Sequence, residues 1–252
     1  MNLAMSTDLS MFSLDGLTAV VAGASRGIGF GLANGLAKAG ASVIGFGRSA
    51  VSEGNSFDYR QCDLNDANAV TGLIRDIETQ SGGIDVYVHV AGITLPSDSD
   101  VQPVEVFSRT LEANLTSAYR TCSLIGQSMA RRRRGSIITV ASIGALMGFP
   151  GNPGYVAAKG GLRMMSKALA LDLGPSNVRV NCIVPGYIQT DMTAGSYNDP
   201  AKNRDRANRT MLGRWGQVDD MVGVAIFLAS GASAYATGAD FVIDGGWTAK
   251  GL

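Results

Sequence analysis

Short apolar runs rich in Val and Ile alternate along the chain with longer segments of helical period. The short runs predict strands at 18–22, 41–46, 57–62, 85–90, 136–141, 178–184 and 239–243, and the longer segments predict helices at 27–39, 66–80, 104–131, 154–173 and 217–229. Strands that are apolar throughout must be buried on both faces, and parallel neighbours need crossover helices. The pattern therefore predicts an α/β fold: a doubly wound, mostly parallel seven-stranded sheet with helices on both faces.

The chain shows no internal repeat and no linker-like change of composition, so we expect a single domain over residues 1–252. Residues 187–212 fit neither period, because they are polar and mixed in charge. So long a polar excursion within a compact domain is typical of a lid or of a disordered segment. The uncharged run 135–158 is long enough to span a bilayer, but its Ser, Thr, Asn, Pro and Gly residues favour a buried strand and a loop.

Charge narrows the range of partners. Lys plus Arg and Asp plus Glu each total 21, which does not favour a nucleic-acid partner. The one dense basic run, from Arg131 to Arg134, is interpreted as a solvated helix C-terminus, where cations are stabilised by the helix dipole.

Cysteine and histidine usage point to a reduced compartment and to no metal site. Cys62, Cys122 and Cys182 are odd in number, far apart and without metal-like spacing. There is a single histidine, His89. Residues 1–12 contain no basic region followed by an apolar stretch, so no export signal is expected. We therefore expect a cytoplasmic protein that does not associate with a membrane.

Tyr155 and Lys159 lie four residues apart in a predicted helix and thus on one face of it. A free phenol, whose pKa is about 10, is a poor acid or base at neutral pH, but a nearby ammonium favours the phenolate. Ser142, thirteen residues upstream, offers a hydroxyl that could hold a substrate oxygen. The spacing alone also occurs on solvated helices, so its meaning depends on the rest of the sequence.

A glycine-rich turn, Gly23-Ala24-Ser25-Arg26-Gly27-Ile28-Gly29, connects the first predicted strand to a helix. Its Gly-x-x-x-Gly-x-Gly spacing is a variant of the dinucleotide-binding fingerprint. Glycines permit a tight turn and a close approach of the backbone to a pyrophosphate, which then meets the amides at the helix N-terminus.

Together these motifs resemble the classical short-chain dehydrogenases/reductases. The resemblance rests on the turn at 23–29, on Asn114, on Ser142 and the Tyr155-x-x-x-Lys159 motif, and on Asp63, Ala91-Gly92 and Pro185-Gly186 after the third, fourth and sixth strands. It extends from about Phe12 to Trp247 with the family's order and spacing. It implies one Rossmann-type domain, a nicotinamide cofactor and hydride transfer to or from a carbonyl or secondary alcohol. It also implies a homotetramer, with the helices at 104–131 and 154–173 as candidate contacts.

The resemblance implies catalytic roles for four residues. Tyr155 would exchange a proton with the substrate oxygen, and Lys159 would lower the phenol pKa and hold the nicotinamide ribose. Ser142 would donate a hydrogen bond to the substrate oxygen, and Asn114 would support a water that links Lys159 to solvent. Simpler interpretations stay open: Asn114 bonds a backbone carbonyl at a helix irregularity, and Ser142 caps a loop.

The implied cofactor-binding residues are Gly23, Ser25, Arg26, Gly27, Ile28, Gly29, Arg48, Ser49, Asp63, Leu64, Ala91, Gly92, Tyr155, Lys159, Pro185, Gly186, Ile188 and Thr190. In NAD sites an acidic residue commonly ends the second strand and bonds the adenosine ribose, but here that position is Gly47. Arg48 and Ser49 follow it, and Arg26 and Ser25 lie in the glycine turn. Two guanidinium groups near one ribose favour a 2′-phosphate. NADP(H) is therefore favoured, and NAD(H) is possible.

The chain departs from the family pattern at two positions. His89-Val90-Ala91-Gly92 stands in place of Asn-Asn-Ala-Gly, which removes the asparagine bonds that tie neighbouring strands. We interpret His89 as structural, with a catalytic role as the alternative. Ala22 replaces the usual threonine before the first glycine and removes a hydroxyl worth about 1 kcal/mol.

The implied substrate pocket is lined by residues 143–149, Ile93, Thr94, Tyr187 and the lid at 190–212, which together carry few charges. The segments 213–216 and 244–247, with 12–14, resemble members of the family that act on sugar acids and polyols. Similar segments occur in 3-oxoacyl carrier-protein reductases, so both substrate classes stay open. A catalytically silent cofactor-sensing or scaffolding protein on the same fold is the alternative function.

Overall fold

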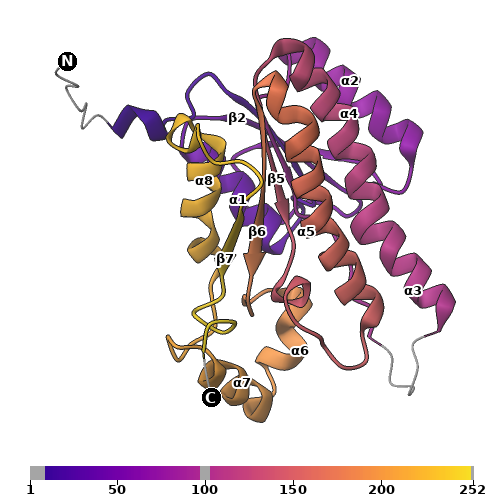
Figure 1. Ribbon diagram of the computed structural model, residues 1–252, viewed down its shortest axis with the longest axis vertical. Helices are drawn as coiled ribbons and strands as arrows, with labels where there is room; N and C mark the ends of the chain where they lie inside the picture. Colours follow the sequence, from indigo (N-terminus) through magenta and orange to yellow (C-terminus); the bar gives the residue numbers. More distant parts are fainter. Residues whose placement is uncertain (1–8, 97–102, 251–252) are drawn as a thin grey trace.

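The computed structural model (Figure 1) describes residues 9–96 and 103–250. Within them seven parallel strands form one sheet in the order β3-β2-β1-β4-β5-β6-β7. The strands are β1 Thr18–Ala22, β2 Ser42–Gly47, β3 Asp58–Gln61, β4 Val86–His89, β5 Gly135–Val140, β6 Val178–Pro185 and β7 Asp240–Ile243. Residues 1–8, 97–102 and 251–252, which the expected single domain includes, lie outside the described residues.

The described helices are α1 Gly27–Lys38, α2 Ala67–Ser81, α3 Val104–Leu111, α4 Ser117–Arg132, α5 Pro153–Leu173, α6 Ala194–Tyr197, α7 Pro200–Arg209 and α8 Val222–Ala229. Several begin where the sequence supplies a cap. Asp66 accepts hydrogen bonds from the backbone of Asn68 and Ala69 at the start of α2, and Asp199 caps α7 in the same way. The helix expected over 217–229 begins as a 3-10 turn, Val218–Met221, before α8.

Helices cover both faces of the sheet, because the strands are apolar on both sides. Val21 packs on one face with Leu32 of α1 and Leu228 of α8. Val20, the preceding residue of β1, points to the other face and packs with Ile125 of α4. Figure 1 shows α1 and α8 on one side of the sheet and α2, α4 and α5 on the other. The predicted doubly wound architecture is confirmed.

The helix predicted over 104–131 is interrupted. A π-helical turn, Glu112–Thr116, separates α3 from α4. Asn114 lies within this turn, and its side-chain amide donates to the Thr110 carbonyl at 2.9 Å. A side chain that bonds a carbonyl of the preceding turn competes with the regular helical ladder, and such π turns commonly mark functional sites.

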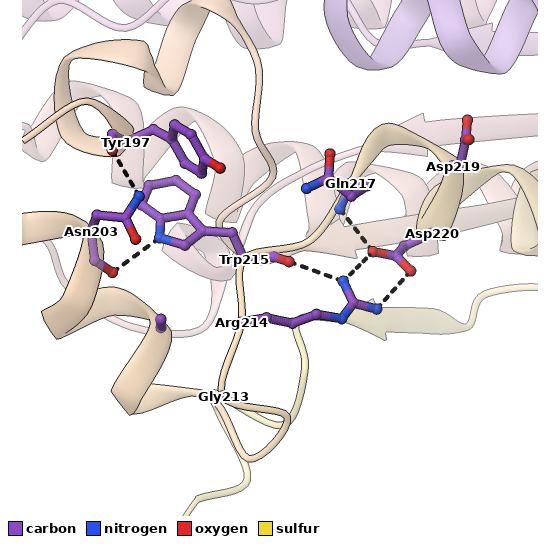
Figure 2. A pocket seen from close by; sticks show the side chains of 9 residues that line it. Tyr197, Asn203, Gly213, Arg214, Trp215, Gln217, Asp219 and Asp220 are labelled. Carbon is purple, nitrogen blue, oxygen red and sulfur yellow. Dashed lines mark hydrogen bonds and ion pairs between the residues drawn. The ribbon is translucent and has the colours of Figure 1, made fainter. Parts of the chain in front are cut away.

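Residues 187–212, predicted to be a lid or a disordered segment, contain the short helix α6 and the longer helix α7. Trp215, just beyond it, is buried, and its indole Nε1 donates to the carbonyl of Asn203 at 3.1 Å. The Asn203 side chain donates in turn to the Tyr197 carbonyl at 2.7 Å. Figure 2 shows this chain of bonds, with Arg214 and Asp220 forming a two-pronged ion pair beside it.

The basic run at the end of α4 differs from its interpretation as a solvated helix end. Arg132 and Arg134 both bond Oδ1 of the buried Asp85, at 3.1 and 2.7 Å. Burial acts to raise the pKa of Asp85, but the backbone amide of Thr18 and the two arginines together hold it below its ordinary value. Two arginines of this run, which precede β5, therefore form ion pairs with the carboxylate of Asp85, which immediately precedes β4.

The helices of the described part of the chain include none that is both long and apolar enough to cross a membrane.

Candidate active site

The predicted site residues lie at one edge of the sheet, beyond the carboxyl ends of the strands. This edge contains the switch point between β1 and β4, where the direction of winding reverses and where ligands of such sheets bind. The residues predicted to bind a cofactor follow β1, β2, β3 and β4, end or follow β6, or lie in the first two turns of α1 and α5. Topology therefore gathers segments that are far apart in the sequence.

The glycine turn after β1 admits no larger residues at two positions. Gly23 has φ +86°, and a Cβ there would lie 2.7 Å from the amide nitrogen of Ala91. A Cβ at Gly29 would lie 2.1 Å from the carbonyl oxygen of Gly23. The turn is thus packed closely between the β4 loop and its own first helical turn. Glycine at these positions adds no side chain that would keep a pyrophosphate from the backbone amides.

Ser142, Tyr155 and Lys159 come together between the end of β5 and the start of α5. The Ser142 hydroxyl is hydrogen-bonded to the Tyr155 phenol and accepts from the Gly144 amide at 3.1 Å, which confirms that Ser142 also caps a loop. Lys159 is buried, lies 5.8 Å from the centroid of the Tyr155 ring and donates to the Val140 carbonyl at 2.9 Å.

Burial dominates the electrostatics of this group. It raises the pKa of Tyr155 above 10.0, although the Ser142 hydrogen bond opposes the shift. It lowers the pKa of Lys159 from 10.5 to about 8. Burial therefore works against the lowering of the phenol pKa that the family resemblance implies. At neutral pH the phenol carries its proton and the ammonium is mainly charged, as a proton donor beside a cation requires.

Asn114 is fully buried and bonds only backbone groups among the described residues. Its amide donates to the carbonyls of Ile93 and Thr110, and its Oδ1 accepts from the Ile93 amide at 3.0 Å. The interpretation that it bonds a carbonyl at a helix irregularity is confirmed. A Cβ at Gly92 would lie 2.4 Å from Asn114 Oδ1 and 3.4 Å from Lys159 Nζ, so Asn114 also fixes the loop against which Lys159 lies.

His89, in place of the family's asparagine, is fully buried in β4. Its Nδ1 bonds the Tyr87 hydroxyl at 2.8 Å. This contact joins two residues of one strand, whereas the asparagine bonds it replaces tie neighbouring strands. Burial, followed by the charge of Lys159, lowers the pKa of His89 to about 3, so the imidazole is neutral at physiological pH.

Tyr59 is a site residue that the sequence reasoning missed. Its hydroxyl donates to the Ser49 carbonyl at 2.5 Å, hydrogen-bonds Ser25 and lies where a side chain at Gly47 would be: a Cβ there would be 3.0 Å from it. Arg48 is exposed, and its guanidinium forms no ion pair with a described residue. The signal was available, because Tyr59 lies two residues after Phe57 in the predicted strand 57–62 and alternates with the polar Asp58 and Arg60.

The remaining predicted positions join the glycine turn to the lid. A Cβ at Gly27 would lie 3.5 Å from Thr190, and the Thr190 amide donates to Thr193 Oγ1 at 3.0 Å. Asp63 accepts from the Asn65 amide at 3.0 Å in the turn before α2. The glycine turn with its exposed Arg26, the exposed Arg48 after Gly47 and the buried Lys159 together fit a nicotinamide dinucleotide.

Comparison with known proteins agrees with this geometry. A family model described as enoyl-(acyl carrier protein) reductase matches residues 23–248. The 2-dehydro-3-deoxy-D-gluconate 5-dehydrogenase of Pseudoalteromonas atlantica is 36% identical over 253 residues, 96% of this chain and 100% of that protein. The 3-oxoacyl-[acyl-carrier-protein] reductase of Chlamydia muridarum is 38% identical over 239 residues, 90% of this chain and 96% of that protein.

Solved structures extend the likeness. The crystal structure of a gluconate 5-dehydrogenase from Burkholderia cenocepacia in complex with NADP and tartrate has a TM-score of 0.90 at 32% identity, and the match covers 96% of this chain and 99% of that chain. The fold and the site define an NAD(P)-dependent oxidoreductase. The chain belongs to the classical short-chain dehydrogenase/reductase family, as its sequence motifs predicted.

Proposed function

We propose that the protein is an NADP(H)-dependent enzyme that interconverts a ketone and a secondary alcohol. The observation that carries this proposal is the convergence of Ser142, Tyr155 and Lys159 at the sheet edge where the glycine turn lies. A protein that only senses a cofactor has no need of a hydroxyl acid bonded to a second hydroxyl beside a buried cation. The silent-protein alternative therefore explains less of the site.

The glycine turn and Lys159 would hold the nicotinamide dinucleotide, which when bound would supply hydride for the carbonyl carbon in the direction of reduction. Ser142 donates a hydrogen bond to the carbonyl oxygen and stabilises the charge that develops on it. Tyr155 transfers its phenolic proton to that oxygen, which completes the alcohol. Lys159 stabilises the phenolate left behind, and Asn114 supports the water path by which the proton is restored.

The choice of NADP(H) over NAD(H) follows from charge at the end of β2. Gly47 provides no carboxylate to repel a 2′-phosphate, and the guanidinium groups of Arg48 and Arg26 lie exposed on the two adjoining loops. The bonds from Tyr59 to Ser49 and from Gln61 to the Arg48 carbonyl, at 2.7 Å, hold the β2 loop in place. The related gluconate 5-dehydrogenase structure contains NADP.

For the substrate we propose a sugar acid or polyol, with a 3-oxoacyl or other carbonyl compound as the second candidate. Both classes are named among the relatives. The centroid of the Tyr187 ring lies 6.4 Å from that of Phe149 and 5.0 Å from that of Trp247. The three rings form an apolar wall beside Ser142.

We also propose a homotetramer in the cytoplasm. Tyr119 of α4 and Met164 and Leu171 of α5 are 54, 57 and 79% exposed, an unusual exposure for large apolar side chains on neighbouring helices. The three cysteines are free and buried, in keeping with a reducing compartment. Light scattering of a monomer at micromolar concentration would refute the tetramer.

The decisive test is Tyr155→Phe, with Tyr235→Phe, a fully exposed tyrosine, as the matched control. We expect Tyr155→Phe to abolish NADPH oxidation with a panel of ketones while NADPH still binds, as measured by its fluorescence. Tyr235→Phe should retain the wild-type rate. An undiminished rate in Tyr155→Phe would disprove the assignment. Wild-type protein that binds NADPH but reduces no carbonyl would favour the silent alternative.

A further inference from the structure

Arg206 of α7 is a cation whose hydrogen-bonding capacity the described part of the protein leaves largely unused. Its guanidinium lies over the Tyr187 ring, 4.9 Å from the centroid. Its Nε is shielded from solvent without a hydrogen-bond partner, and Nη1 reaches only the Lys202 carbonyl, at 3.4 Å. A buried donor without a partner is costly and rare in folded proteins, so it needs an explanation.

Two cations near Arg206 are already paired. Arg209 bonds Asp205 at 3.2 Å, and Arg214 forms its two-pronged ion pair with Asp220. None of the ion pairs among the described residues includes Arg206. In the cavity of about 570 Å³ beside Trp215 (Figure 2), the one arginine of the lining, Arg214, is thus paired with Asp220, whereas Arg206 has no counter-ion among the described residues.

Tyr187 connects Arg206 to the candidate active site. The ring of Tyr187 packs at 6.4 Å from Phe149 and joins the apolar cluster that contains Ala141 and Ile143, the two residues that flank Ser142. The same ring lies 5.0 Å from Trp247. Arg206 thus lies one aromatic ring away from the segment that holds Ser142, on the lid helix that Figure 1 shows beyond the ends of β6 and β7.

We propose that Arg206 binds a carboxylate of the substrate, so that the enzyme acts on oxo acids and hydroxy acids in preference to neutral carbonyl compounds. The inference rests on the proposed function and assigns a binding residue to it. A guanidinium stacked on an aromatic ring keeps its N–H groups in its own plane, free to form a forked pair with a carboxylate.

The position of Arg206 is fixed before any ligand arrives. The bonds from Trp215 to Asn203 and from Asn203 to Tyr197 hold α7 against the body of the protein, as Figure 2 shows. Binding to a preformed donor loses little conformational freedom, and the aromatic wall excludes water that would weaken the charge-assisted bonds.

The test compares Arg206→Gln and Arg206→Lys with Arg204→Gln. Arg204 lies on the same helix but is exposed and forms no ion pair with a described residue, so it controls for the loss of one positive charge from α7. Each enzyme is assayed with NADPH on sugar-derived oxo acids and on the neutral amide of each acid.

We expect Arg206→Gln to raise KM for the acids by roughly 10- to 100-fold, the value of a charge-assisted bond, and KM for the amides by less than about twofold. Arg206→Lys should give an intermediate loss for the acids, because it keeps the charge but not the fork. Arg204→Gln should behave as wild type. Equal losses on acids and amides, or a wild-type enzyme that does not prefer acids, would overturn the inference.

A second readout does not depend on turnover. Calorimetric titration of the NADPH-loaded proteins with tartrate, a dicarboxylate probe, should show binding to wild type and Arg204→Gln and at least tenfold weaker binding to Arg206→Gln. Tartrate binding that Arg206→Gln leaves unchanged overturns the carboxylate site, whether or not the enzyme is active. Arg206-dependent tartrate binding in a protein that reduces no carbonyl supports the anion site and refutes the proposed reaction. An uncharged 3-oxoacyl thioester reduced better than any acid, equally by wild type and Arg206→Gln, refutes the site and leaves the reaction standing.

Discussion

Placing a carboxylate at the end of β2, by Gly47→Asp, probes the proposed cofactor preference directly. A Cβ at position 47 would lie 3.0 Å from Tyr59 Oη, 3.7 Å from Ser25 Oγ and 3.9 Å from Gly23 Cα. The new side chain therefore enters between the glycine turn and β3, among the groups proposed to hold the 2′-phosphate. We expect NADPH to bind more weakly as a result.

The size of the effect follows from Coulomb's law. Two like charges about 5 Å apart at an effective dielectric constant of about 20 repel by about 3 kcal/mol. Arg48 and Ser49 are exposed, so water and salt reduce this repulsion, and we expect at least about 1.4 kcal/mol, or tenfold in affinity. NADH, which lacks the phosphate, escapes the repulsion.

The Tyr59 side chain determines whether the new carboxylate raises the affinity for NADH. Its hydroxyl must move to admit any side chain at position 47, because 3.0 Å is too close for ordinary contact. Gly47→Asp alone should therefore weaken the binding of NADPH without strengthening the binding of NADH. The double variant with Tyr59→Phe, which removes the hydroxyl, should allow the carboxylate to reach the ribose and raise NADH affinity.

The assay is fluorescence titration of NADPH and NADH at low and high salt, with Gly47→Asn as a neutral control of the same size. Gly47→Asp should bind NADPH at least tenfold more weakly than Gly47→Asn does, and high salt should reduce this difference in affinity. Equal losses in the two variants would show that steric conflict with Tyr59, and not charge, disfavours NADPH, and would refute the electrostatic reasoning.

Three further predictions follow from buried ionisable groups. Lys159→Met should abolish activity yet raise the free energy of unfolding at pH 7 by about 1–4 kcal/mol, because the pKa of about 8 shows that the native state disfavours the proton that the unfolded chain accepts. This gain in stability should shrink above pH 8, and a lower stability of the variant in chemical denaturation would refute the prediction. Asp85→Ala should lower the free energy of unfolding by about 3 kcal/mol, because it leaves Arg132 and Arg134 without their carboxylate partner. This difference should be present above pH 3.8 and be lost as the pH falls through the lowered pKa of Asp85 in the native state. A denaturation midpoint equal to that of the wild type would contradict the prediction. His89, the only histidine, should show no titration by NMR between pH 8 and 5, because its pKa is about 3. In this pH range only the unfolded chain takes up the proton, so the free energy of unfolding should fall as the pH drops below 6.5. A titration midpoint near 6.5 in the folded protein would show that the ring is accessible to water.

The sheet and its covering helices were predictable because the information is local. Every strand was found within about two residues. The central strands are apolar, β-branched runs buried on both faces and leave an unbroken signal, whereas the edge strand β3 is polar and partly exposed. The break between α3 and α4 was not found. Residues 104–131 have helical period throughout, and the π turn arises from the bonds that Asn114 makes to Thr110 and to Ile93, which is 21 positions away. The helices within residues 187–212 likewise depend on Trp215, which lies outside that segment.

The sequence by itself determined the family, the glycine turn and the residue types needed for proton and hydride transfer, because each is a short motif in a fixed order along the chain. Only the tertiary structure decided the electrostatics. The raised pKa of Tyr155, the lowered pKa of Lys159 and the neutral His89 follow from burial, which depends on how distant segments pack. Two contacts join residues of different elements: the hydroxyl of Tyr59 lies beside Gly47, and the guanidinium of Arg206 lies over the ring of Tyr187. Such contacts leave no periodic trace in a sequence, because the distance between two side chains in space is set by the fold and not by their separation along the chain.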